Sequence, residues 1–333
     1  MDRIDYRQSG VDIDAGNETV RRVKELARTT YTPAVLSGVG SFGGLFALES
    51  PGGSPVLVAS ADGVGTKLKV AFMAGVHDTV GVDLVNHCIN DILVQGARPL
   101  FFLDYLATGR LAPDVAEQIV KGVAAACREN GCALLGGETA EMPGFYADGE
   151  YDIAGFIVGL VERERVIDGR SIRAGDCLIA LPSSGLHTNG YSLARRIVFD
   201  VLKLDVGAYV EELGSTVGEA LLRPHRSYLG VVTPLLERGW IKGMAHITGG
   251  GLTENVPRTL PDGRGFSLDR GSWTVPPLFT WLQRAGDVDD REMLRAFNMG
   301  VGMVLVASPA AVDDALRTLR ASGEPAWLLG RVT

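Results

Sequence analysis

The feature that most constrains this chain is a short polar run between two apolar segments. The run Ser60-Ala-Asp62-Gly-Val-Gly65-Thr66-Lys67-Leu-Lys69 follows the apolar stretch 55–59 and precedes the apolar stretch 68–74. That order predicts a strand, a tight turn and a helix. The glycines let backbone N–H groups approach an anion, and the helix N-terminus adds the positive end of its dipole. Because the lysines can neutralise phosphate and Asp62 can bind Mg²⁺, the run predicts a nucleotide-phosphate and metal site.

Two other interpretations of glycine-rich runs stay open. The polar run can be a helix-capping turn with solvated lysines, since the P-loop pattern G-x-x-x-x-G-K-[ST] is absent from the chain. The run Gly38-Val-Gly40-Ser-Phe-Gly43 matches G-x-G-x-x-G, but only a strand-length segment follows it before a Pro/Gly turn. That context disfavours a nicotinamide dehydrogenase. We interpret residues 38–43 as a loop that covers a ligand, with a plain surface loop as the alternative.

Length, composition, net charge and cysteine count restrict the class of protein to which the chain can belong. The chain has 333 residues, 46 % hydrophobic and 22 % charged, which suits two globular domains. Its net charge of −8 disfavours a nucleic-acid partner. The four cysteines form no C-x-x-C pair, so we expect reduced thiols and a cytoplasmic protein. A charged N-terminus and the lack of a long apolar run predict no signal peptide and no membrane span.

Strand-like and helix-like segments alternate along the whole chain, which predicts an α/β or α+β fold. A charged, turn-rich stretch at 162–175 predicts a domain boundary, with domains at 1–168 and 169–333. The expected helices are 11–29, 68–74, 78–96, 113–130, 191–202, 251–260, 277–285 and 309–321. The expected strands are 43–48, 55–60, 99–107, 132–135, 151–161, 177–181, 241–246, 299–307 and 326–332.

The helix expected at 78–96 carries an unusual polar face. Asp83, Asn86, His87, Asn90 and Asp91 fall within an arc of roughly 140° at about 100° per residue. Asp and Asn are poor helix formers, so their concentration suggests a binding role for metal or ligand. The alternatives are an ordinary solvated face and, for His87 alone, a surface or interface histidine.

Three further predicted loops carry side chains suited to metal binding, phosphate binding or proton transfer. The pattern at 136–144 predicts a glycine-rich turn at the end of a strand. This turn carries two more acidic residues, Glu138 and Glu141. Acidic side chains beside lysines are the residue types that Mg²⁺-dependent phosphoryl transfer uses. Residues 183–190 and 246–255 place hydroxyls, glycines and an amide before helices, which suits a phosphate ester, or else simple N-caps. His187 and His246 in these loops are candidates for proton transfer or binding.

Together these segments resemble the aminoimidazole ribonucleotide synthetases, the phosphoribosylformylglycinamidine cyclo-ligases of purine biosynthesis. The resemblance runs nearly end to end and rests on GGETAEMPG, SSGLHTNGYSL and FFLDY at 136–144, 183–193 and 101–105. It implies two α/β domains, the first forming a β-barrel across a homodimer. It also implies ATP-dependent phosphorylation of the formamide oxygen of formylglycinamidine ribonucleotide, attack by the amidine nitrogen, ring closure and release of phosphate.

The resemblance also implies roles for individual residues. ATP would contact Gly40, Gly43, Asp62, Gly63, Gly65, Thr66, Lys67, Lys69, Asp83, Asp91, Gly137 and Glu138. Mg²⁺ would be held by Asp62, Asp83, Asp91 and Glu138. The small-molecule substrate would contact Ser183, Ser184, Gly185, His187, Thr188, Asn189, Thr248, Gly249, Gly250 and Asn255. His187, His246 and Lys67 are the catalytic candidates.

The chain departs from the family pattern at Arg7, where Lys is frequent, and at Ser37 and Ser41, where Gly is frequent. Another ATP-using member of the superfamily, such as a selenophosphate synthetase or a thiamine-phosphate kinase, is the alternative function. The selenium enzyme needs a reactive cysteine near its N-terminus, whereas the first cysteine here is Cys88. A non-catalytic nucleotide-binding protein is the alternative from a different class.

Overall fold

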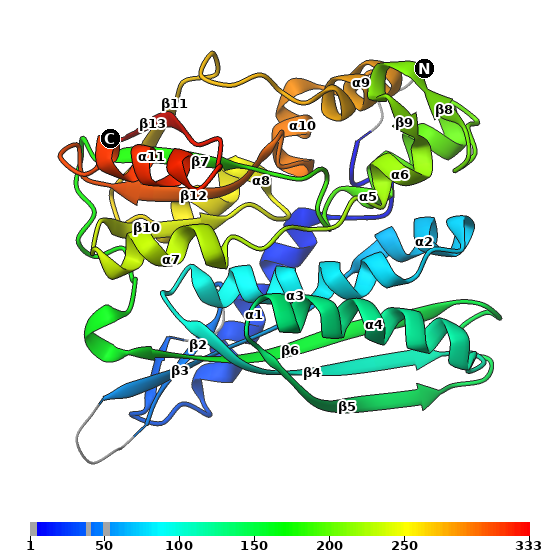
Figure 1. Ribbon diagram of the computed structural model, residues 1–333, viewed down its shortest axis with the longest axis horizontal. Coiled ribbons are helices and arrows are strands. Elements are labelled where there is room, and N and C mark those ends of the chain that lie inside the picture. Colours follow the sequence, from blue (N-terminus) through cyan, green and yellow to red (C-terminus); the bar gives the residue numbers. More distant parts are fainter. Residues whose placement is uncertain (1–4, 38–40, 49–53) are drawn as a thin grey trace.

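The structure is a computed structural model that describes residues 5–37, 41–48 and 54–333. It has two halves, each built on one main sheet, and they are stacked with helices between them (Figure 1). The fold is mixed α/β, as the alternation of segments predicts. Among the described residues, no helix has the length and apolar character required to cross a membrane.

The first half is a six-stranded sheet, within the described residues, in the order β1-β2-β3-β6-β4-β5. Its strands are β1 (Val35–Ser37), β2 (Gly44–Ala47), β3 (Pro55–Gly63), β4 (Arg98–Thr108), β5 (Ala133–Glu141) and β6 (Tyr151–Glu162). Neighbours are antiparallel except β4 and β5, which α4 connects as a parallel crossover. The helices are α1 (Ile13–Arg28), α2 (Leu68–Ala74), α3 (Asp78–Leu93) and α4 (Pro113–Glu129).

The second half is an antiparallel sheet of five described strands in the order β10-β12-β7-β13-β11. Its strands are β7 (Cys177–Pro182), β10 (Ile241–His246), β11 (Phe266–Leu268), β12 (Val301–Ala307) and β13 (Trp327–Val332), with a small ribbon of β8 (Tyr209–Val210) and β9 (Ser215–Thr216). Its helices are α5 (Tyr191–Arg195), α6 (Val217–Leu221), α7 (Leu229–Glu237), α8 (Gly251–Asn255), α9 (Pro277–Gly286), α10 (Asp290–Ala296) and α11 (Val312–Ala321). Every residue of β12 is buried, because both of its neighbours are strands and both faces are covered.

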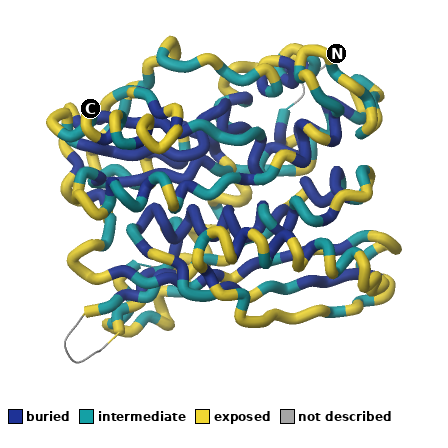
Figure 2. The backbone as a smooth tube through the Cα atoms, viewed as in Figure 1, coloured by how far each residue is buried: buried dark blue, intermediate teal, exposed yellow. Residues whose placement is uncertain are grey.

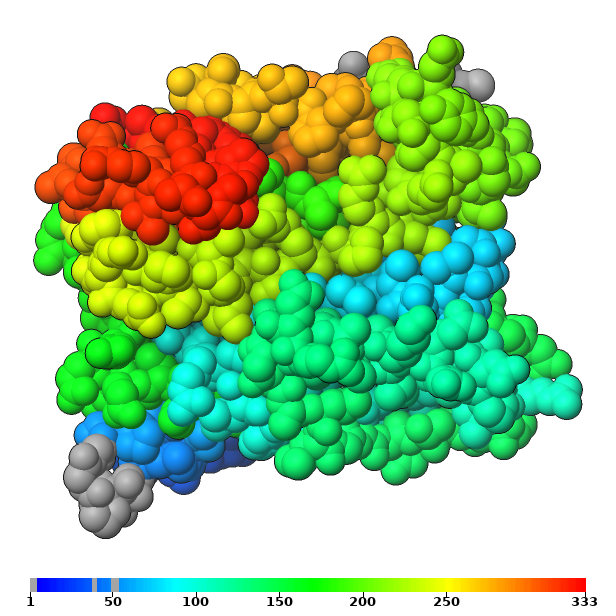
Figure 3. Space-filling model, viewed as in Figure 1, coloured from blue at the N-terminus to red at the C-terminus, as the bar shows by residue number. Residues whose placement is uncertain are grey.

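α3 is the middle layer of the molecule. It packs on β3 and β6 of the first sheet and against α4, and its other side meets the second half. Figure 2 shows this helix as an almost unbroken dark segment between the two halves, and Figure 3 shows the halves in contact along a seam across the view. The polar face of α3 is therefore not the solvated face that composition alone allows.

Most predicted elements are confirmed within a few residues, and one region is wrong. The sequence predicts a short buried strand at 132–135 followed by a glycine turn, whereas β5 continues through Glu141 and is largely exposed. Gly137 instead allows the two strands to approach closely, because a Cβ there would overlap Asp104 of the neighbouring strand. Glu138 and Glu141 are therefore strand residues. The helix predicted at 191–202 is α5 continued by a π-helical turn to Val201, and that at 251–260 is α8 continued by a 3-10 turn to Thr259.

Two predictions fall outside the described residues. Gly40 of the predicted glycine-rich loop lies within 38–40, and the Pro/Gly turn predicted after the strand 43–48 lies largely within 49–53. Gly43 is described, and a Cβ added to it would lie 3.0–3.3 Å from atoms of Gln95, Ala59 and Val58. Its carbonyl accepts a hydrogen bond from Gln95 Nε2 at 2.9 Å.

The contact between α3 and α4 depends on two glycines. A Cβ on Gly122 would overlap the backbone oxygen of Asp78, and one on Gly81 would overlap that of Ile119. Backbone atoms cannot move aside as a flexible side chain can. The absence of both side chains therefore lets the two helices pack unusually closely.

We expect Gly122→Ala to lower the free energy of unfolding by about 1–3 kcal/mol, because overpacking forces the helices apart. Urea unfolding monitored by circular dichroism measures this. Gly16→Ala in α1 is the matched control, since a Cβ there meets nothing within 4 Å. It should be neutral or stabilising by up to about 1 kcal/mol. Equal stability of the two variants would contradict the proposed packing role of Gly122.

Candidate active site

The polar face of α3 binds the backbone of the segment 223–228 in the second half. Asp83 Oδ1 accepts the His225 N–H at 2.6 Å, and Asn86 Nδ2 donates to the His225 carbonyl at 2.8 Å. One turn on, Asn90 accepts the Tyr228 N–H at 3.0 Å and donates to the Arg226 carbonyl at 2.9 Å. These bonds satisfy buried polar groups on both sides. They fix where the second half sits on the first.

A buried ion pair lies in the same interface. The ammonium group of Lys67 is 2.7 Å from Asp83 Oδ2, and neither side chain is exposed to solvent. Lys67 Nζ also donates to the Arg223 carbonyl at 2.9 Å and the His187 carbonyl at 3.4 Å. Burial lowers the pKa of Lys67 and raises that of Asp83, while their mutual attraction opposes both shifts. Lys67 thus pairs with Asp83 within the first half and joins the two halves through the Arg223 and His187 carbonyls.

A cleft of about 290 Å³ opens beside this interface, where β3 ends. The turn 62–65 and His87 form one wall, and Thr188, Asn189 and Thr248 of the second half form the other. Gly65 has a φ of +68°, a conformation that glycine adopts without strain. Two chain segments far apart in sequence therefore meet where the sequence predicts phosphate-binding turns.

His87 links the two walls of the cleft. Its Nε2 lies 2.8 Å from Asp62 Oδ2 and 3.8 Å from Asp91 Oδ2, and its Nδ1 lies 2.8 Å from Thr188 Oγ1. Burial alone would lower the pKa of this imidazole, but the carboxylates of Asp62, Asp91 and Asp83 raise it to about 9. His87 is therefore protonated at neutral pH and pairs with Asp62.

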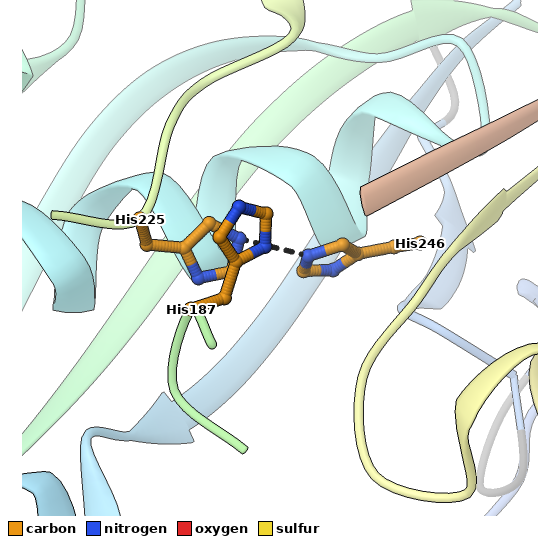
Figure 4. Close-up of side chains that lie close together, drawn as sticks. All are labelled: His187, His225 and His246. Carbon is orange, nitrogen blue, oxygen red and sulfur yellow. Dashed lines mark hydrogen bonds between the residues drawn. The ribbon is translucent and has the colours of Figure 1, made fainter. Parts of the chain in front are cut away.

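The His87 ring lies near those of His225 and His246. These two converge with a third histidine, His187 (Figure 4). His246 Nδ1 is 2.8 Å from Asp91 Oδ1, and its Nε2 is 3.0 Å from His225 Nε2. The His187 ring stacks on that of His225 with centroids 3.9 Å apart. Burial lowers the pKa of all three, so they are neutral at pH 7. His187 has a φ of +61°, a strained conformation for a residue with a side chain, and its Nε2 accepts the Ser184 N–H at 3.1 Å.

The structure brings together part of the predicted site. Asp62, Gly63, Gly65, Thr188, Asn189 and Thr248 line the cleft, and Asp91 lies directly behind it. Lys67, His187 and His246 are buried next to the cleft but are not among its lining residues. Thr66 contacts Ser192 across the interface through their hydroxyls, at 3.1 Å. Gly249 and Gly250 form the turn behind Thr248, and Asn255 Nδ2 donates to the carbonyls of Gly249 and Gly251 in that turn.

Other predicted residues lie elsewhere in this single copy of the chain. Ser183, Ser184 and Gly185 line a separate cavity of about 260 Å³ with Arg223 and residues 276–279. Lys69 pairs with Glu150 at 2.6 Å near the surface.

Gly137 and Glu138 on β5 are separated from Asp62 on β3 by three strand spacings of the sheet. Asp62, Gly155, Asp104 and Gly137 pair in one row across four strands. At about 4.8 Å per strand, Gly137 is roughly 14 Å from Asp62. Glu138, the next residue, points to the opposite face of the sheet.

Sequence reasoning missed His225 entirely. It occurs in no recognisable motif, and its contacts with α3 are largely through its backbone, which any residue type could supply. The sequence signal for His225 is indirect. The chain has five histidines, and one of them, His87, is predicted to lie on a polar helix face.

The donor set of the cleft suits a divalent cation that accompanies a nucleotide. Asp62 and Asp91 present carboxylate oxygens that lie 2.8 Å and 3.8 Å from His87 Nε2. The side chain of Asp62 is partly exposed to the cleft. Oxygen ligands of this kind are those that Mg²⁺ prefers. Asp83 does not fit that role, because Lys67 and the His225 N–H occupy its oxygens.

Comparison with known proteins gives a consistent result along the chain. Residues 44–161 match the N-terminal domain model of AIR synthase related proteins, and residues 173–333 match the C-terminal domain model. The chain is 59 % identical over 331 residues to the phosphoribosylformylglycinamidine cyclo-ligase of Trichlorobacter lovleyi, covering 99 % of this chain and 95 % of that protein. It is 57 % identical to the cyclo-ligase of the same name from Sorangium cellulosum, with the same coverage.

Solved structures with this fold share little sequence with the chain. A thiamine-monophosphate kinase from Stenotrophomonas maltophilia superposes with a TM-score of 0.63 at 19 % identity, covering 95 % of this chain and 92 % of the kinase. A T. maritima PurL structure in complex with ADP gives a TM-score of 0.59 at 16 % identity, covering 90 % of this chain and 43 % of that one. At these identities the likeness shows the fold alone.

Because Lys67 and Asp83 form a buried ion pair, we expect their contributions to the free energy of unfolding to be strongly coupled. We expect Lys67→Met to lower the free energy of unfolding by about 3–5 kcal/mol, because it leaves a buried carboxylate unpaired. Adding Asp83→Asn should restore part of that loss, since the amide oxygen still accepts the His225 N–H. Urea unfolding of the wild type, both single variants and the double variant measures the coupling. Additive losses would contradict a direct pairing of the two charges.

Proposed function

Because this chain belongs to the family of AIR synthase related proteins, we propose that it is an ATP-dependent cyclo-ligase that makes the imidazole ring of 5-aminoimidazole ribonucleotide. ATP phosphorylates the formamide oxygen of formylglycinamidine ribonucleotide. The amidine nitrogen attacks the activated carbon, a C–N bond closes the ring, and phosphate leaves with ADP as the second product. Relatives 57–59 % identical over nearly their whole length carry the cyclo-ligase name, which supports this reaction over the other ATP-using alternatives.

The single observation that carries the proposal is the cleft where the turn 62–65 faces Thr188, Asn189 and Thr248. Phosphoryl transfer followed by ring closure requires two reacting parts of one substrate to be held beside the nucleotide. Backbone N–H groups of the glycine turn suit the nucleotide phosphates, and the hydroxyl and amide side chains opposite suit the substrate. Since the two walls come from different halves, both reactants can be oriented against each other.

Asp62 and Asp91 are proposed to hold the Mg²⁺ that accompanies ATP. The ion supplies charge neutralisation on the phosphates when it is bound. His87, paired with Asp62 and close to Asp91, balances these carboxylates. Lys67, His187 and His246 are then positioning residues, because each is buried behind the cleft wall. His246 holds Asp91 through its Nδ1, and Lys67 holds the loop that carries Thr188 through the His187 carbonyl.

We expect Asp62→Asn to reduce substrate-stimulated ADP release by at least about 100-fold, the scale for loss of a group that stabilises transferred charge. Its melting temperature should change by no more than a few degrees, because Asp62 is partly exposed at the cleft. The assay compares ADP release from ATP and Mg²⁺ with and without formylglycinamidine ribonucleotide, and it quantifies the aminoimidazole product. Asp314→Asn, on an exposed face of α11, is the control.

Two outcomes of that assay would contradict the proposal. If the wild type released no more ADP with the amidine substrate than without it, the cyclo-ligase function would fail. If Asp62→Asn lost activity and melting temperature in equal proportion, the role of Asp62 would be structural.

We propose that the protein acts as a homodimer that pairs the exposed face of the first sheet. Ala61, Phe156 and Leu103 stand in one row across β3, β6 and β4. Phe156 and Leu103, with Leu135 on β5, are exposed large hydrophobic residues. An apolar sheet face of this kind is typical of an interface. Glu138 points to this same side of the sheet, so a second copy offers a way to bring it to a nucleotide site.

We expect Phe156→Asp to convert a dimer into a monomer, because a carboxylate would be buried without a partner in the interface. Light scattering after size-exclusion chromatography gives the mass of each species. Tyr209→Asp, an equally drastic change at an exposed residue of β8 in the second half, should remain dimeric. A monomeric wild type at micromolar concentration would overturn the homodimer.

Two further statements belong to the proposal. The division into residues 1–168 for ATP binding and dimerisation and 169–333 for substrate binding remains our assignment of the domains. The cytoplasm is the proposed compartment, supported by four cysteines that are all buried free thiols.

A further inference from the structure

Beside the cleft, side chains from both halves bring nitrogen and oxygen donors to one place. His87 and Asp91 lie one turn apart on α3, and His246 ends β10. One ligand atom from each lies within 4.8 Å of the other two, and all three residues are buried. An ordinary nucleotide-associated Mg²⁺ needs no imidazole. The presence of two in this set therefore asks for a separate explanation.

The donor atoms face one another rather than pointing apart. Asp91 Oδ1 is 2.8 Å from His246 Nδ1, and Asp91 Oδ2 is 3.8 Å from His87 Nε2. Asp62 Oδ2 reaches the same His87 nitrogen at 2.8 Å from the cleft side. Two carboxylates thus lie against two imidazole nitrogens. Pairs of ligand atoms on one divalent ion have separations of about 3 Å, given metal–ligand bonds of about 2.0–2.2 Å.

The outward nitrogens of both rings already have partners. His87 Nδ1 lies 2.8 Å from Thr188 Oγ1, and His246 Nε2 lies 3.0 Å from His225 Nε2, the bond drawn in Figure 4. In metal sites the second nitrogen of a ligating histidine is usually held by a hydrogen bond, which fixes the ring and its tautomer. Here those bonds direct His87 Nε2 and His246 Nδ1 toward Asp91.

The chemistry of the set identifies the kind of ion. Imidazole nitrogens favour zinc and its first-row neighbours, whereas Mg²⁺ prefers oxygen and retains its waters. The carboxylates of Asp62 and Asp91 would neutralise the charge of a dication.

We propose that His87, Asp91 and His246, with Asp62 closing the cleft side, form a binding site for a divalent transition metal such as Zn²⁺ or Co²⁺. Such an ion would take the carboxylates that the proposed function assigns to the nucleotide's Mg²⁺. The inference deepens the proposed function, because it concerns the metal selectivity of that same cleft. Its test needs neither ATP nor substrate.

The test is titration of the whole, chelator-treated chain with Co²⁺, followed by visible absorption, with Zn²⁺ displacement measured by calorimetry. We expect one ion per chain with the intense d–d bands of a low-coordinate nitrogen and oxygen site. His87→Gln and His246→Gln should each weaken binding by at least about 100-fold, since loss of a direct ligand exceeds the 10–100-fold cost of losing a supporting hydrogen bond. His77→Gln is the matched control, because His77 contacts Tyr151 and no residue of the site.

Folding is checked by circular dichroism, and His87→Asn with His246→Asn serve as second variants should either Gln variant unfold. Unchanged Co²⁺ affinity in folded variants at both histidines would overturn the site, as would the absence of stoichiometric binding to the wild type. Sulfur-to-cobalt charge-transfer bands would assign binding to the cysteines and also overturn it. Intact cobalt binding without substrate-stimulated ADP release would refute the proposed function alone. Normal turnover without cobalt binding would refute this site alone.

Discussion

The hydrogen bonds between the polar face of α3 and the backbone of residues 223–228 are the constraint on which the rest of this structure depends. A buried amide or carboxylate without a partner costs free energy, so the two halves fit only where Asp83, Asn86 and Asn90 all find theirs. An apolar contact of equal area would stabilise the stack but would tolerate sliding. Lys67 adds a second restraint, because its ammonium group joins α3 to two carbonyls of the other half.

The contacts across that interface determine the geometry of the cleft. Its walls belong to different halves, so their positions relative to each other depend on how the halves are joined. The bond between His87 and Thr188 crosses the gap directly, and Lys67 holds the neighbouring His187 carbonyl. The strained φ of His187 is maintained because its ring is packed against His225 and bonded to the Ser184 N–H. Rigidity at the joint is therefore the means by which two separate turns act as one site.

The extent to which sequence predicted this arrangement follows from how local each signal is. The polar arc of α3 is a property of helical spacing, so its five residues were identifiable from the sequence. The segment that docks on the arc was not, because residues 223–228 bind mainly through N–H and C=O groups that every sequence carries. Gly137 misled for a related reason: a glycine signals a turn, but here it permits close approach to Asp104 within a sheet. The α/β class and the two domains were predicted from segment alternation and the charged stretch at 162–175, whereas the reaction came from family resemblance, which no single pattern would have supplied.

Charge balance explains why His87 lies among carboxylates on the polar face of α3. Asp62 and Asp91 both lie against His87, and two carboxylates this close at a partly buried wall repel each other. The imidazolium of His87 lies between them and removes that repulsion. His246, kept neutral by burial, fixes the far oxygen of Asp91 without adding a second positive charge. One charged and one neutral ring thus hold both carboxylates in place, and the same nitrogens are those that a transition metal would bind.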